Sequence, residues 1–128
     1  MIGIGIDIVE IDRIEKAIDK QTRFLTKILT DYERSYYKNK GSKAETVAGL
    51  FAAKEAVSKV LGKGIAGYTW QDIEVSHDIN GKPEITLLNG ALEQAKSLGI
   101  KNILVSISHC KTYAVANAAG VKGDEYVK

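Results

Sequence analysis

The 128-residue sequence has one cysteine, one proline and no run of 18 consecutive apolar residues. A lone cysteine, Cys110, excludes an internal disulfide, and the missing apolar run argues against a helical membrane span. The sequence shows no basic leader followed by an apolar segment, so a reducing cytoplasm is the default. A formal charge of +2 is too small to indicate a nucleic-acid binder. We therefore expect a cytoplasmic protein that binds neither membrane nor nucleic acid.

The remaining composition is typical of an ordinary globular domain. Hydrophobic residues make up 45% of the chain and charged residues 27%. A chain of this length buries about two thirds of the surface that it exposes when unfolded. No linker, repeat or low-complexity tract divides it, so we expect a single domain over residues 1–128.

Hydrophobic periodicity predicts alternating short strands and helices. Strands are expected at residues 2–9, 72–78, 84–88, 102–109 and 112–119. Helices are expected at residues 10–19, 22–29, 31–40, 42–62 and 89–99. Asn80 and Gly81 predict a hairpin turn, and Thr30 or Asp31 is the expected cap of the third helix. Ser42, with Glu45 three residues later, predicts a capping box at the start of the long helix.

The long helix places a lysine among core residues. At 100° per residue, one broad stripe contains Val47, Leu50, Phe51, Lys54, Val57, Ser58 and Leu61. Small residues occupy the opposite face, so the helix is expected to be enclosed on most sides. Because an unpaired buried ion costs several kcal/mol, Lys54, Glu55 and Lys59 require partners. Either a ligand supplies them, or Lys54 reaches solvent along its methylene stem and Glu55 pairs with Lys59.

The first strand carries a candidate metal ligand. Asp7 is the only charge in the first nine residues, and it shares a strand face with Gly3 and Gly5, which leave room beside it. If this face abuts the long helix, Asp7 and Glu55 supply two oxygen ligands that suit magnesium. The alternative is an aspartate that only caps the following helix.

Two further segments have residues of chemical interest. GKGIAG, residues 62–67, matches G-x-G-x-x-G but follows a helix. This context excludes a dinucleotide-binding fold and leaves a phosphate-binding loop, a plain helix end, or both. Ser108 and His109 point to opposite faces of a strand, which makes a nucleophile and base pair geometrically poor. We expect His109 to contact a phosphate or hydroxyl group and Cys110 to be a small buried residue.

Four segments together resemble one family over nearly the whole chain. GIGIDIVEIDRI, FAAKEAVSKVLGKGI, WQDIEVSHDINGKP and VSISHCKTYAVA follow one another as in holo-acyl-carrier-protein synthases. The resemblance implies an α+β fold, with a small antiparallel sheet around a long central helix, and a homotrimer with sites at subunit interfaces. It also implies Mg²⁺-dependent transfer of 4'-phosphopantetheine from coenzyme A to a serine of apo-acyl carrier protein, in fatty acid biosynthesis. Adenosine 3',5'-bisphosphate is released.

The resemblance also implies roles for individual residues. Asp7 and Glu55 are the expected metal ligands, and with Lys59 they form the expected catalytic group. Coenzyme A is expected to contact Lys54, Ser58, Lys59, Gly62, Gly64, Asn80, Gly81, Lys82, Pro83 and His109. The carrier protein is expected to dock on Arg13, Gln21, Arg23 and Phe24, although Phe24 can equally be a core residue. The family often has arginine at position 50, so Lys43 or Lys63 is expected to replace that contact here.

Two other functions remain compatible with the residues alone. One is a non-catalytic trimeric module that binds carrier proteins or nucleotides, in which Asp7 and Glu55 form structural ion pairs. The other is a magnesium-dependent phosphohydrolase. The sequence also leaves open whether Glu55 or a water that it orients accepts the serine proton.

Overall fold

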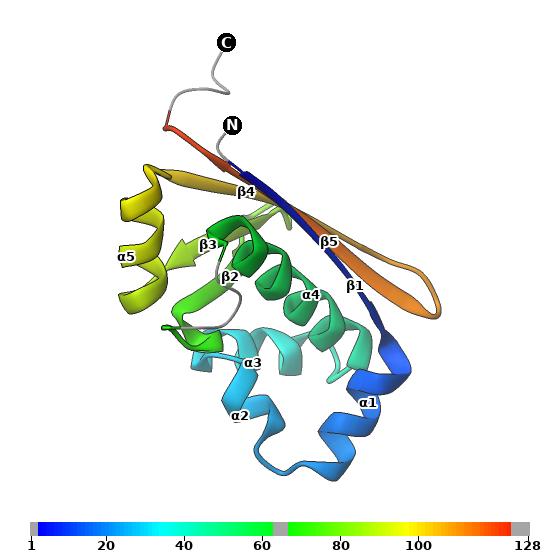
Figure 1. Cartoon of the computed structure of the whole chain (residues 1–128). Coiled ribbons are helices and arrows are strands. Elements are labelled where there is room, and N and C mark those ends of the chain that lie inside the picture. The colour runs from blue at the N-terminus through cyan, green and yellow to red at the C-terminus, as the bar shows by residue number, and fades with distance from the viewer. Residues whose placement is uncertain (1–2, 63–66, 124–128) are drawn as a thin grey trace.

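The computed structural model describes residues 3–62 and 67–123. A three-stranded antiparallel sheet has the order β1 (Gly3–Glu10), β5 (Tyr113–Val121), β4 (Asn102–His109). The long helix α4 (Ala44–Leu61) lies across one face of this sheet, and in Figure 1 no helix or strand of the described residues covers the other face. The expected α+β architecture, a small antiparallel sheet around a long central helix, is confirmed.

The other elements surround α4. Helices α1 (Ile11–Lys20), α2 (Phe24–Ile28) and α3 (Asp31–Asn39) lie near its N-terminal end (Figure 1). A short 3₁₀ turn, η1 (Trp70–Asp72), leads into the hairpin β2 (Ile73–His77) and β3 (Pro83–Leu87), and α5 (Asn89–Leu98) precedes β4. None of the described helices combines the length and apolar character needed to cross a membrane.

Strand β1 turns its glycines toward α4 and its isoleucines away from it. A Cβ atom on Gly5 would lie 2.1 Å from the main-chain oxygen of Ala56, so only glycine permits this approach of helix and strand. The room that we expected beside Asp7 is therefore filled by the helix backbone. Ile4, Ile6 and Ile8 are 70%, 60% and 63% exposed on the outer face.

The predicted enclosure of α4 is confirmed, but its predicted start is wrong. Apart from the partly exposed Phe51, all residues of the expected stripe are buried. Gly62 ends the helix in the left-handed conformation, with φ of 81°. Ser42 is itself left-handed, with φ of 54°, because it belongs to the turn that follows α3. The helix therefore begins at Ala44 after Lys43, without a side-chain cap.

Local signals predicted two other features correctly and one incorrectly. Thr30 caps α3 in a capping box: its Oγ1 accepts from the Glu33 amide at 3.2 Å, and Glu33 Oε1 accepts from the Thr30 amide at 2.8 Å. The 78–82 turn joins β2 and β3 with Gly81 at a φ of 84°. Cys110, expected to be buried, is exposed between β4 and β5, where its Sγ accepts from the Tyr113 amide at 3.4 Å.

Candidate functional site

Asp7, Glu55 and Lys59 converge where β1 crosses α4. Lys59 Nζ lies 3.4 Å from Asp7 Oδ1 and donates a 2.7 Å hydrogen bond to the main-chain oxygen of Ile6. Burial raises the pKa of Glu55, and the nearby Asp7 carboxylate raises it further, whereas Lys59 opposes the shift. Lys59 therefore binds Asp7 across the two elements, and no hydrogen bond or ion pair joins it to Glu55, the partner expected four residues earlier.

This cluster offers two carboxylates to a cation. Within residues 3–62 and 67–123, no group of three His, Cys, Asp or Glu side chains could hold a metal ion, which argues against a closed zinc site there. Two partly exposed carboxylates suit magnesium, which keeps several of its waters in protein sites. The mutual repulsion of Asp7 and Glu55 is the feature that a bound cation would relieve.

Lys54 was expected either to reach solvent or to contact a coenzyme A phosphate, but its ammonium group lies away from solvent and from the Asp7 cluster. Lys54 Nζ lies 2.7 Å from Glu33 Oε1, with both side chains fully buried, and it donates to the main-chain oxygen of Trp70 at 2.9 Å. The other Glu33 oxygen accepts from the Val75 amide at 2.7 Å. Burial lowers the pKa of Lys54 against the opposing effect of Glu33. Lys54 thus joins α4, α3 and the β2 region, and its expected phosphate contact is not supported.

Replacing Lys54 by Met is therefore expected to destabilise the fold by about 3–5 kcal/mol, because it leaves the buried Glu33 carboxylate without its counter-ion. Urea unfolding measures this loss. The exposed Lys27→Met variant is the control, and its change should stay within about 0.5 kcal/mol. If the Lys54→Met protein is as stable as the wild type and only binds coenzyme A weakly, the expected contact of Lys54 with a phosphate would be supported after all.

Ser58 is likewise turned inward. Its side chain is buried, and its Oγ donates to the main-chain oxygen of Glu55 at 2.7 Å. The hydroxyl is thus occupied within the helix, so the expected coenzyme A contact of Ser58 is also not supported. Gly62 ends α4, whereas Gly64 and Lys63 lie outside the described residues.

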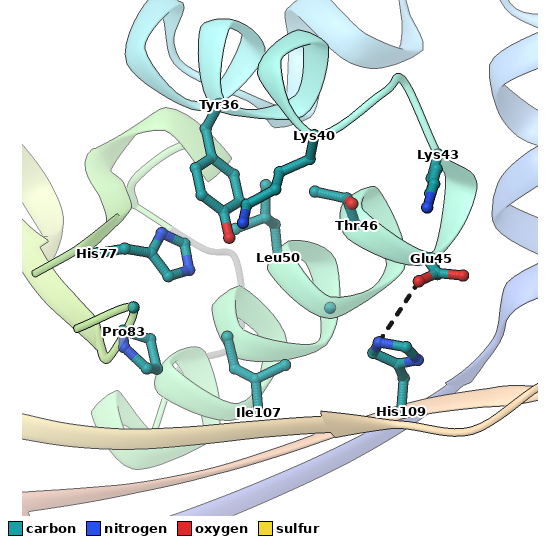
Figure 2. Close-up of a pocket in the computed structure, with 12 residues that line it drawn as sticks. Tyr36, Lys40, Lys43, Glu45, Thr46, Leu50, His77, Pro83, Ile107 and His109 are labelled. Atoms are coloured by element: carbon teal, nitrogen blue, oxygen red, sulfur yellow. Dashed lines mark ion pairs between the residues drawn. The ribbon is translucent and has the colours of Figure 1, made fainter. Parts of the chain in front are cut away.

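A second feature is a cavity of about 320 Å³ between α3, the start of α4, the 78–82 turn and β4 (Figure 2). His109 and two residues of the expected turn, Gly81 and Pro83, line it; Asn80 and Lys82 are not among its lining residues. Lys43 lines the same cavity as Leu50. Lys43 therefore remains the predicted replacement for the arginine that the family often has at position 50.

The cavity is rich in groups that can carry positive charge. Figure 2 shows the Tyr36 hydroxyl pointing into it from α3 and Lys40 from the residue that follows α3, with Lys43 and His109 across the opening. The one carboxylate of the lining, Glu45, lies 3.5 Å from His109 Nε2. Such a lining favours an anionic ligand.

Sequence reasoning missed Tyr36, Lys40 and His77 in this cavity. The His77 ring stacks on Tyr36 with centroids 4.1 Å apart, and Lys40 Nζ lies 5.7 Å from the Tyr36 ring centroid. Tyr36 and Lys40 are four residues apart at the C-terminal end of α3, a spacing that places them on one face and was an available signal. The stack with His77 joins residues 41 positions apart, which no local pattern predicts.

The expected docking residues lie on α1 and at the start of α2. Arg13, Gln21 and Arg23 are exposed. Phe24 is half-buried, with its ring centroid 6.5 Å from that of Phe51. It therefore packs on the core while part of it remains accessible.

Known proteins share this sequence and fold. The 4'-phosphopantetheinyl transferase superfamily matches residues 3–118. Holo-[acyl-carrier-protein] synthase of Alkaliphilus metalliredigens is 52% identical over 116 residues, which cover 91% of this chain and 95% of the relative.

Two solved structures have the same fold as this chain. The Plasmodium yoelii acyl carrier protein synthase with ADP bound superposes with a TM-score of 0.87 at 36% identity, covering 96% of each chain. Helicobacter pylori holo-[acyl-carrier-protein] synthase in complex with coenzyme A superposes with a TM-score of 0.81 at 37% identity, covering 92% of this chain and 99% of the other. On these matches the chain belongs to the holo-acyl-carrier-protein synthases of the 4'-phosphopantetheinyl transferase superfamily.

Proposed function

We propose that this protein transfers 4'-phosphopantetheine from coenzyme A to a serine of apo-acyl carrier protein and releases adenosine 3',5'-bisphosphate. The observation that carries the proposal is the convergence of Asp7, Glu55 and Lys59 in a chain that matches this family over residues 3–118. A pair of carboxylates beside a lysine is suited to phosphoryl transfer, in which positioning and electrostatic stabilisation do most of the catalysis.

Asp7 and Glu55 would hold Mg²⁺, whose chemistry when bound is to neutralise charge on the pyrophosphate oxygens. Lys59, half-exposed beside Asp7, supplies a second positive charge next to the reacting phosphates. Docking of the carrier protein holds its serine in line with the phosphorus joined to pantetheine, so that the nucleotide leaves on the opposite side.

The cationic cavity is proposed to hold the nucleotide end of coenzyme A. Lys40, Lys43 and His109 surround it, and they suit the 3'-phosphate of the leaving nucleotide. Glu45, in the cavity wall, and Glu55 lie on the same helix ten residues apart, which corresponds to about 15 Å. We propose that the cavity of one protomer is completed by the acidic pair of its neighbour in a homotrimer.

The outer face of the three-stranded sheet is the proposed trimer surface. Ile4, Ile6 and Ile8 project from β1, and Leu104 of β4 is also exposed on this face. Strand β1 is covered by α4 on its glycine face only, and a row of exposed isoleucines on the opposite face is typical of an interface between chains. No other feature of the described fold accounts for this apolar surface.

Charge reversal tests the proposed carrier-protein surface. Replacing Arg13 or Arg23 by Glu is expected to raise the KM for acyl carrier protein severalfold and to leave the KM for coenzyme A nearly unchanged, because an interface charge steers association. Added salt should weaken the wild-type interaction as well, since exposed charges are screened over about 8 Å at physiological ionic strength. Equal loss for both substrates, or no loss, would place docking elsewhere.

The fate of coenzyme A tests the proposed reaction. Chromatography of the nucleotides should detect adenosine 3',5'-bisphosphate only when apo-acyl carrier protein and Mg²⁺ are both present. Release of inorganic phosphate without the carrier protein would support the phosphohydrolase alternative. Unchanged coenzyme A that nevertheless binds the protein would support the non-catalytic module.

A further inference from the structure

Residues 69–72 form a connection, here called the bridge segment, between the catalytic helix and the proposed docking helix. Lys54 of α4 donates to the main-chain oxygen of Trp70 at 2.9 Å. On the other side, Gln71 Nε2 donates to the main-chain oxygens of Thr26 at 2.5 Å and Leu29 at 3.0 Å, at the end of α2. Trp70, which accepts from α4, and the next residue, Gln71, which donates to α2, thus tie the helix that carries Glu55 to α2.

The bridge segment is fixed by its own contacts. Asp72 accepts from the Thr69 amide at 3.0 Å through one carboxylate oxygen and from Asn89 Nδ2 at 2.9 Å through the other. The Leu88 amide donates to the main-chain oxygen of Asp72 at 2.8 Å. Asp72 therefore closes the segment on Thr69 and fixes it to residues 88–89, so that Gln71 faces α2 from a fixed position.

Aromatic packing follows the same route. The Trp70 and Phe51 rings stack with centroids 5.0 Å apart. The centroid of the Phe51 ring lies 6.5 Å from that of Phe24, the first residue of α2. The apolar layer therefore runs from the bridge segment across α4 to the proposed carrier-protein surface.

Helix α2 depends on such external support. It has only five residues, and Arg23 at its N-cap makes no capping hydrogen bond through its side chain. A helix this short is not stable by itself, and the carbonyl groups of its last turn need partners outside the helix. The amide group of Gln71 donates to two of these carbonyl groups, those of Thr26 and Leu29. The Leu29 oxygen also accepts from Arg34 Nη1 at 2.5 Å, whereas Gln71 is the side chain that reaches Thr26.

We infer that Gln71 is a positioning residue for carrier-protein recognition, which acts by holding α2 and its Arg23 at a fixed place relative to Glu55. Gln71 need not touch the carrier protein to do so. The inference rests on the proposed docking surface, and it adds a residue from a distant part of the sequence that sets the geometry of that surface.

The test is steady-state kinetics of Gln71→Ala and of Gln71→Met, which keeps the side-chain length but removes the donor. Both should raise the KM for acyl carrier protein about threefold to tenfold, the range that corresponds to one net hydrogen bond, and leave the KM for coenzyme A within about twofold. Gln94→Ala is the matched control, because Gln94 Nε2 also donates to a main-chain oxygen, that of Leu61, at 2.8 Å. It should leave the KM for the carrier protein unchanged.

Combining Gln71→Ala with Arg23→Glu distinguishes the positioning role of Gln71 from the location of the docking surface. Since Gln71 acts by placing α2, its effect should shrink once Arg23 is reversed, so the two substitutions should be less than additive. A normal KM in the Gln71 variants, with Arg23→Glu still defective, would overturn the inference and leave the docking surface standing. Normal values in all variants would overturn both. Equal rises in the two KM values, with a lower melting temperature, would show a general structural role and also overturn it.

Discussion

Replacing Asp7 by Asn or Glu55 by Gln is expected to lower kcat/KM for transfer by about 100-fold to 1,000-fold, and to weaken its dependence on Mg²⁺. Each substitution removes one of the two carboxylates that we propose as metal ligands, and metal stabilisation of a reacting phosphoryl group contributes several kcal/mol. The remaining carboxylate and Lys59 would hold a cation much less well. A titration of the transfer rate against Mg²⁺ concentration measures both effects.

The fold should survive these substitutions. Burial raises the pKa of Glu55, and repulsion by the Asp7 carboxylate raises it further. Glu55→Gln should therefore leave the melting temperature equal or higher, the usual trade-off between stability and activity at such sites. Asp7→Asn also removes the ion pair with the half-exposed Lys59, so its melting temperature should change little. Glu93→Gln, an exposed carboxylate on α5, is the control and should behave as wild type. A fully active, folded Asp7→Asn or Glu55→Gln protein would refute the metal assignment.

Replacing Ile6 by Glu is expected to convert the proposed homotrimer into monomers and to abolish most transfer. Ile6 lies in the middle of the exposed isoleucine row of β1, opposite Asn117 in the register of β1 and β5. A carboxylate buried there in an interface, without a partner, costs several kcal/mol in every subunit. Activity should fall with assembly, because we propose that neighbouring protomers complete one another's sites.

Analytical ultracentrifugation combined with an activity assay measures this result. Leu98→Glu, at an exposed apolar position of α5, introduces the same charge on another surface and should leave both mass and activity unchanged. A monomeric wild type with full activity would refute the proposed assembly. An Ile6→Glu protein that remains trimeric would instead exclude this face of the sheet as its interface.

The sequence predicted where the elements lie better than which of their faces are buried. Strict alternation in residues 2–9 identified β1, but it identified the two faces without saying which is inside. The isoleucine face is the more hydrophobic, yet α4 packs on the glycine face, because only there can the helix backbone come within reach of the strand. We propose that a second chain covers the exposed apolar row, and a periodicity within one chain contains no information about that chain's partners.

In the candidate site, the chemically active residues were predicted, but the partner of Lys54 was not. Asp7 and Glu55 were predicted from their chemistry and from an assumed contact of β1 with α4, Lys59 was added by the family resemblance, and the structure brings the three together. Lys54 was placed correctly on the buried stripe, but its partner, Glu33, was not predicted because the pair forms across 21 residues. The capping box at Thr30 and Glu33 was the available local signal, and it anchors the same carboxylate that binds Lys54.

The central claim is that this chain, with Mg²⁺, attaches phosphopantetheine to the carrier protein. Intact mass spectrometry of apo-acyl carrier protein, after incubation with the metal-stripped protein and coenzyme A, tests it most directly. The carrier protein should keep its mass without metal, gain one phosphopantetheine group when Mg²⁺ is restored, and keep its mass when its acceptor serine is replaced by alanine. An unmodified carrier protein in the complete mixture, with the chain folded and coenzyme A intact, would contradict the account.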